Sequence, residues 1–109
     1  MDTQESINSI LDQHVGESNA ISWANLCWAV DPNMDAGELR GVIHTMRQAG
    51  ALICSSPKGY YRPKDYKEVK NFTDRLRQPA RDQLLTARIL RDAARNEFAG
   101  QMEMFGEQK

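Results

Sequence analysis

The sequence of 109 residues has little in common with a membrane or secreted protein. No segment approaches the roughly 18 consecutive apolar residues that a membrane-spanning helix needs. The first ten residues, MDTQESINSI, have neither the basic start nor the apolar stretch of a signal peptide. The two cysteines, Cys27 and Cys54, fall on apolar faces, so we expect small core residues and no disulfide. We therefore expect a cytoplasmic protein that does not enter a membrane.

Catalytic and metal-binding motifs are also missing. The chain has no phosphate-binding glycine loop, no nucleophile motif, and no close pair of acids outside the expected helix caps. The histidines and cysteines are of the metal-binding type, but no two of them have the close spacing of a structural zinc site: His14, Cys27, His44 and Cys54. We therefore expect no enzyme and no metal or other cofactor.

The chain is not uniformly basic, as a strong non-specific DNA-binding protein would be. Its net charge is −1. Residues 1–57 contain seven acids and two bases, a net charge of −5, whereas residues 58–100 contain eleven bases and six acids, a net charge of +5. The last nine residues contain two acids and one base, a net charge of −1. A polyanion would therefore bind mainly through the second half of the chain.

Hydrophobic spacing predicts two helices and a short strand in the first part of the chain. Apolar residues at helical spacing predict a helix over residues 4–15 that ends at Gly16. Ala20 and Ile21 are expected to form a short edge strand that pairs with a later hairpin. Ser22 is a good N-cap for a second helix, Trp23–Val30, and Asp31-Pro32 should end it.

The best-defined element is a third helix over residues 35–49. Asp35 and Glu38 have the spacing of a capping box, and Gly50 stands where a left-handed C-cap is expected. A single apolar stripe should face the core: Leu39, Val42, Ile43 and Met46. The four residues Ser56-Pro57-Lys58-Gly59 predict a tight turn between two strands. Neighbours in a strand point to opposite sides, so one of Tyr60 and Tyr61 must face the core.

This order of helix, turn, helix and hairpin, with the local pattern IHTMRQAG…CSSPKGYY, resembles the winged-helix family of DNA-binding domains. The resemblance covers about the first sixty residues. It implies a mainly α protein with a small β-hairpin, of the α+β class, in which a three-helix bundle and a wing make up a domain over residues 1–64. Small proteins of this combination are similar to those encoded by bacteriophages and mobile elements.

The resemblance also implies which side chains would meet double-stranded DNA. Outward residues of the third helix would enter the major groove, where such side chains contact base edges and phosphates: Arg40, His44, Thr45, Arg47 and Gln48. Residues of the hairpin would hold the flanking backbone: Lys58, Tyr60 and Arg62. The alternatives are a structural helix that mediates protein contacts, and tyrosines that merely pack the hairpin on the helices.

A helical extension is expected over residues 65–99. Asp65 and Glu68 form a second capping box, and a fourth helix should run to about Arg77. Pro79 then either opens a fifth helix as its first-turn residue, which we favour, or lies in one kinked helix. The apolar surface of this extension is wide, so it either covers the domain or forms a homodimer with a second copy of itself.

Four arginines of the extension share one face and could follow a phosphate backbone: Arg81, Arg88, Arg91 and Arg95. Asp92 lies within helical reach of two of them, so a solvated, salt-bridged face is the favoured interpretation.

The tail, residues 100–109, contains Gln101-Met102-Glu103-Met104-Phe105. This pentapeptide resembles the short motif by which replication and repair proteins dock on the bacterial sliding clamp. The resemblance implies that a polar anchor and apolar side chains enter preformed pockets of the clamp: Gln101, Met102, Met104 and Phe105. The alternative is a helix end whose apolar side chains pack on the domain.

Together these patterns predict a DNA-binding winged-helix protein of regulatory or replication-associated function, with a tail that docks on the clamp. The alternative is an adaptor or inhibitor that binds only proteins.

Overall fold

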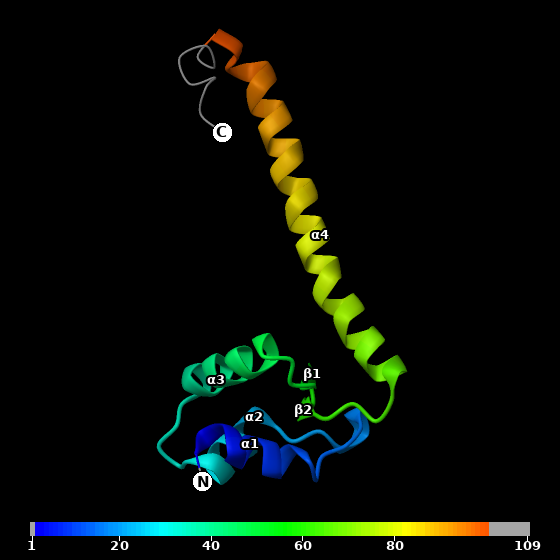
Figure 1. The fold of residues 1–109 in the computed structure, drawn as a ribbon. Coiled ribbons are helices and arrows are strands. Elements are labelled where there is room, and N and C mark those ends of the chain that lie inside the picture. Colours follow the sequence, from blue (N-terminus) through cyan, green and yellow to red (C-terminus); the bar gives the residue numbers. More distant parts are fainter. Residues whose placement is uncertain (1, 101–109) are drawn as a thin grey trace. The chain divides into compact units, whose positions relative to one another are not determined.

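The computed structural model describes residues 2–100 and shows a mainly helical chain with one small antiparallel hairpin (Figure 1). The elements are α1 (Thr3–Leu11), the 3-10 turn η1 (Glu17–Asn19), α2 (Trp23–Val30), α3 (Ala36–Gln48), β1 (Cys54–Ser56), β2 (Gly59–Tyr61) and α4 (Tyr66–Glu97). The chain divides into two compact units at the junction of Thr73 and Asp74, later than the expected boundary after residue 64.

Side-chain caps fix where four of the helices begin. The carboxylate of Asp2 accepts a hydrogen bond from the Glu5 amide at 2.8 Å, and the Ser22 hydroxyl accepts one from the Asn25 amide at 3.2 Å. Asp35 caps α3 in the same way through the Glu38 amide at 2.8 Å. At the start of α4 the Glu68 amide donates to Asp65 at 3.0 Å. Each cap satisfies a backbone donor that the helix itself leaves without a partner.

Helix α1 ends at Leu11, so the expectation that it would extend to residue 15 was wrong. The backbone beyond it pairs with the exit of the hairpin instead. The Arg62 amide donates to the His14 carbonyl at 2.9 Å, and the Gly16 amide donates to the Arg62 carbonyl at 2.7 Å. These bonds hold residues 14–16 beside Arg62 instead of in a helix, and Val15 is 48% exposed rather than part of the core.

The hairpin has the expected turn, and Ile21 pairs with it through an isolated bridge where an edge strand was expected. Cys54 pairs with Tyr61, and Ser56 with Gly59. The amide and carbonyl of Ile21 exchange hydrogen bonds with those of Tyr60 at 2.9 and 2.8 Å. Gly59 has φ +132°, and a Cβ at this position would collide with the Ile21 carbonyl. Glycine is therefore required for the edge segment to approach the hairpin.

The core of the N-terminal unit lies among the first three helices and the entry to the hairpin. One cluster of buried side chains consists of Ile7, Leu11, Leu26, Cys27, Leu39, Ile43, Met46 and Ile53. The predicted stripe of α3 is confirmed, with Val42 half-buried at its edge. A second, smaller cluster joins Cys54, Tyr61 and Phe72, so the first turns of α4 belong to this unit.

Helix α4 is one continuous helix that contains Pro79, so the favoured expectation of two separate helices was wrong and the single-helix alternative was correct. Proline lacks the amide that would bond the carbonyl one turn earlier. Because residues 74–100 are all exposed, water can satisfy that carbonyl, which makes a proline inside the helix tolerable.

Cys27 and Cys54 are buried and form no disulfide, as predicted. In the part of the chain that the structure describes, no helix combines the length and the apolar character that crossing a membrane requires.

Candidate nucleic-acid interface

The outer face of α3 presents three polar side chains four residues apart. Arg40, His44 and Gln48 are exposed, because the opposite face of the helix lies in the core. Thr45 is also exposed, but its hydroxyl donates back to the Gly41 carbonyl at 3.1 Å. Within residues 2–100, the Arg40 guanidinium forms no ion pair or hydrogen bond. This face therefore offers one uncommitted cation and two further hydrogen-bonding groups.

Arg47, also expected to contact DNA, is held by the protein itself. Its Nε donates to the Ile53 carbonyl at 2.7 Å, and a terminal nitrogen lies 3.4 Å from the Ser55 hydroxyl. The guanidinium carbon sits 5.0 Å from the centre of the Phe72 ring and 6.0 Å from that of Tyr60. Burial lowers the pKa of Arg47, and nearby Tyr60 and Cys54 partly offset that effect. Arg47 thus fastens α3 to the hairpin and to the first turns of α4.

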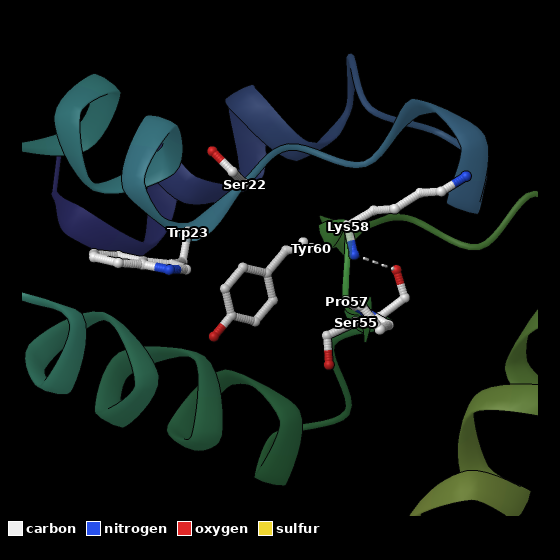
Figure 2. A pocket seen from close by; sticks show the side chains of 8 residues that line it. Ser22, Trp23, Ser55, Pro57, Lys58 and Tyr60 are labelled. Carbon is white, nitrogen blue, oxygen red and sulfur yellow. Dashed lines mark hydrogen bonds between the residues drawn. The ribbon is translucent and has the colours of Figure 1, made fainter.

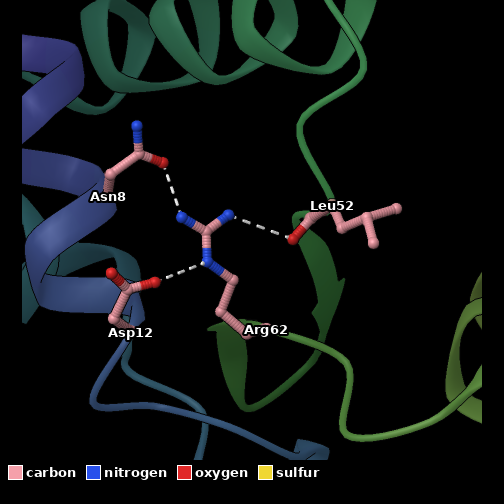
Figure 3. A network of polar contacts seen from close by, with 4 residues as sticks. All are labelled: Asn8, Asp12, Leu52 and Arg62. Carbon is pink, nitrogen blue, oxygen red and sulfur yellow. Dashed lines mark hydrogen bonds and ion pairs between the residues drawn. The ribbon is translucent and has the colours of Figure 1, made fainter.

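Arg62 is likewise engaged, as Figure 3 shows. Its guanidinium donates to the Leu52 carbonyl at 3.2 Å, to the Asp12 carboxylate at 3.3 Å, and to the Asn8 side-chain oxygen. The Arg62 side chain is only 19% exposed. Two of the three arginines expected at the interface therefore have their donors occupied by acceptors of the N-terminal unit.

The hairpin and the start of α2 enclose a cleft of about 350 Å³ (Figure 2). Its lining combines hydroxyl, aromatic and cationic groups: Ser22, Trp23, Ser55, Ser56, Pro57, Lys58, Gly59 and Tyr60. Lys58 is exposed at the turn, where its amide donates to the Ser56 hydroxyl at 3.1 Å. Tyr61 is the buried tyrosine, at 1% exposure, while Tyr60 is half-buried beside the main core. Tyr61 belongs to the second core cluster and Tyr60 packs against the first, so both tyrosines pack the hairpin on the helices, as in the alternative interpretation.

Trp23 was not among the residues singled out from the sequence, although its side chain is 56% exposed in this cleft. The one available signal is its position directly after the Ser22 cap, where a side chain in the first turn of a helix often projects from the end of the bundle. Trp28, further along α2, is 71% exposed. Helix α2 therefore displays two large aromatic side chains that helical periodicity alone would have assigned to packing.

The electrostatic character of the N-terminal unit is close to neutral. Residues 2–73 contain nine acids and seven bases, a net charge of −2, and the engaged arginines Arg47 and Arg62 are two of those bases. Asp35 and Glu38 lie exposed at the start of α3. Any contact with a polyanion must therefore be local and made by a few cations.

The arginine face of α4 is exposed, and an ion pair on it joins Arg95 to Asp92 at 3.3 Å. This pair is the kind that the sequence predicted. Among residues 2–100 no three His, Cys, Asp or Glu side chains come together in a way that could hold a metal ion. The expected clamp-binding residues Gln101, Met102, Met104 and Phe105 lie outside the described residues.

Comparison of the chain with protein-family models, with curated proteins and with solved structures found no match. The functional assignment consequently depends on the chain's own residues.

Proposed function

We propose that the N-terminal unit binds duplex DNA through the outer face of α3 together with the hairpin, in the manner of a winged-helix protein. The observation that supports this most directly is the division of α3 into a core face and a bare polar face bearing Arg40, His44 and Gln48. An α-helix fits the major groove of B-form DNA, where glutamine recognises adenine and arginine binds either guanine or a flanking phosphate.

The hairpin supplies the second part of the proposed interface. Lys58 is exposed at the turn, and the cleft beside it presents the hydroxyls of Ser22 and Ser55. Lysine and serine are common phosphate-binding side chains that position a protein on the duplex without selecting its sequence. Arg47 and Arg62 take a supporting role in this proposal, because they hold the hairpin against the helices.

The affinity for DNA should depend less on salt concentration than it does for most DNA-binding proteins, because few cations are available to contact phosphates. If Arg40 and Lys58 are the phosphate contacts, the logarithm of the binding constant should fall against the logarithm of salt concentration with a slope of about −2. Fluorescence anisotropy of labelled duplexes, started at low salt and repeated as salt is raised, measures both affinity and slope. We expect Arg40→Ala to weaken binding and to reduce the slope by about one.

Lys67→Ala is the matched control, because it removes the same charge from an exposed position at the start of α4. It should leave affinity nearly unchanged. Equal losses from Arg40→Ala and Lys67→Ala would mean that only overall charge matters and that α3 is not the interface. No binding of any duplex at low salt would refute the proposal.

A protein adaptor is the second candidate, and the exposed tryptophans of α2 favour it. Trp23 and Trp28 are 56% and 71% exposed, and tryptophan is a frequent anchor of protein interfaces. This function predicts that Trp28→Ala abolishes partner binding and that the wild-type chain does not bind DNA. A regulatory or replication-associated role is compatible with either candidate function.

The tail adds a separate proposal. Gln101–Phe105 docks on the bacterial sliding clamp, so that the protein brings DNA, or a regulatory effect, to the replication machinery. This part rests on the pentapeptide sequence alone.

A further inference from the structure

The C-terminal unit leaves an apolar helix surface without a partner among the described residues. Residues 74–100 are all exposed, and the large apolar side chains of α4 retain more than half of their accessible surface: Leu76, Leu84, Leu85, Ile89 and Leu90. Isolated helices owe little stability to their own propensity, and most are held by packing of an apolar face. Helix α4 therefore needs a partner.

One stripe of α4 follows a seven-residue repeat, and it includes two of these five apolar side chains, Leu76 and Leu90. Ala80, Ala87 and Ala94 are seven apart, and so are Leu76, Gln83 and Leu90. Together they form one stripe with alternating spacings of four and three, which is the pattern of two helices wound around each other. Alanine at every second position of this stripe lets two helix backbones approach closely. The arginines Arg81, Arg88 and Arg95 fall outside the stripe and remain in solvent.

We propose that α4 pairs in parallel and in register with α4 of a second copy of this chain, through the stripe Leu76, Ala80, Gln83, Ala87, Leu90 and Ala94. Gln83 favours the parallel orientation of the two helices over the antiparallel one. In a parallel pair it faces Gln83 of the other copy, and two side-chain amides can donate to and accept from each other. In an antiparallel pair it would face an alanine and lose that partner.

Charge supports the same direction. In the antiparallel alignment with the longest overlap, Arg77 would flank Arg91 of the other copy, and like charges side by side are unfavourable. In the parallel alignment the flanking neighbours are Pro79 with Leu84 and Thr86 with Arg91, which do not repel. The parallel pair also places Glu97 opposite Glu97 of the other copy. This repulsion is small, because Glu97 is the last residue of α4 and helix ends fray.

A parallel pair makes both chains enter the paired helices at the same end. Two copies of the N-terminal unit are then available to one duplex, and a symmetric dimer binds two half-sites. This last consequence rests on the proposed DNA binding, whereas the pairing itself does not.

Sedimentation equilibrium without DNA tests the pairing. The wild-type chain should show a species of twice the 12.4 kDa chain mass. Leu90→Glu should weaken self-association by about a hundredfold, because each of two copies loses a buried leucine. Leu85→Glu is the matched control: Leu85 is 57% exposed and Leu90 is 63% exposed, but Leu85 lies off the stripe. A wild-type monomer, or equal losses from both variants, would overturn the proposal.

Cysteine crosslinking tests the direction. Ala94→Cys should form a disulfide-linked dimer on mild oxidation, since Ala94 faces its own copy in the parallel pair. In the antiparallel pair that overlaps over the whole stripe, Ala94 faces Leu76, so the two copies of Ala94 lie about 18 residues apart, roughly 27 Å along the helix. The wild-type chain, whose Cys27 and Cys54 are buried, is the control. A dimer that fails to crosslink through Ala94→Cys would refute the parallel arrangement.

Discussion

Arg62 joins three separate segments of the N-terminal unit through one guanidinium group. It donates to Asn8 of α1, to Asp12 just after that helix, and to the Leu52 carbonyl before the hairpin (Figure 3). The Asp12 side chain is 69% exposed, so solvent screens that ion pair. The part-buried hydrogen bond to Asn8 contributes most of the stabilisation, because a hydrogen bond from a charged donor is comparatively strong and this one is less exposed to solvent than the bond to Leu52.

We expect Arg62→Ala to lower the free energy of unfolding by about 1–3 kcal/mol, the usual range for hydrogen bonds to a charged group. Urea denaturation measures this loss. Arg40→Ala is the control and should change stability by less than about 0.5 kcal/mol, since Arg40 is exposed and unpaired within the described chain. A variant Arg62→Ala of normal stability but weakened DNA binding would show that Arg62 acts in recognition instead.

Two glycines allow backbone conformation to be separated from packing. A Cβ added at Gly41 or at Gly50 would meet no atom within 4 Å, but Gly50 has φ +96° whereas Gly41 lies inside α3. We expect Gly41→Ala to raise the free energy of unfolding by about 0.5–1 kcal/mol. Gly50→Ala should lower it by about 1–2 kcal/mol, the cost of a left-handed non-glycine residue. Changes of the same sign in urea denaturation would contradict this account.

The Cys27 thiol should make stability depend on pH in the alkaline range. Burial raises the pKa of Cys27 above its ordinary 9.0, with smaller contributions from Asp35 and Glu38. The folded chain therefore keeps a proton that the unfolded chain has already lost, so the stabilisation is present below pH 9.0 and declines as pH rises above it. Unfolding free energies from pH 7 to 10 should fall less steeply for Cys27→Ala than for the wild type. Identical slopes would contradict the prediction.

At the scale of elements, α4 is a 32-residue helix with a proline in its interior. Pro79 removes one backbone donor and costs a helix interior about 3 kcal/mol relative to alanine. Pro79→Ala should therefore increase helix content and the thermal stability of α4, as measured by circular dichroism at 222 nm. Gln78→Ala, a neighbouring change that leaves every backbone donor in place, is the control. A loss of helicity in Pro79→Ala would mean that the proline is required for the pairing of α4.

The elements of the N-terminal unit were largely predictable from local sequence. Caps such as Ser22 and Asp35 act on amides three residues away, so their effect does not depend on distant parts of the chain. The end of α1 was not predictable in this way. Val15 continues the helical spacing of α1, but the backbone of His14 and Gly16 on either side of it hydrogen bonds to Arg62, which lies far along the chain. Helix α4 continues through Pro79 because this part of the helix is exposed to solvent, and hydrophobic periodicity alone does not predict solvent exposure.

At the scale of the whole molecule, the proposed functions separate along the chain. The proposed DNA binding would use α3 and the hairpin, the proposed self-association would use α4, and the proposed clamp binding would use Gln101–Phe105. Deletion of residues 101–109 should abolish binding to purified bacterial sliding clamp and leave affinity for duplex DNA and the free energy of unfolding unchanged. Surface plasmon resonance with immobilised clamp measures the loss of binding. The single substitution Phe105→Ala tests how much of that loss is due to one apolar side chain. Unchanged clamp binding after the deletion, or no clamp binding by the full chain, would refute the proposal that this pentapeptide binds the clamp.

The candidate interface was predictable only in part. Helical spacing was sufficient to place Arg40, His44 and Gln48 on the outer face of α3, because the core stripe of the same helix fixes its orientation. The exposure of Trp23 was not foreseen, since an aromatic residue in an amphipathic helix is more often buried.

The sequence by itself determined where the capped helices begin, the turn chemistry and the side of α3 that faces the core, because caps, periodicity and glycine act over a few neighbouring residues. Only the tertiary structure decided what Arg47 and Arg62 do. Both have the same chemistry as Arg40, but the hairpin places the Ile53 and Leu52 carbonyls within reach of their donors. Charge and residue type are properties of the chain, whereas the partner that satisfies them depends on which distant segments the fold brings together.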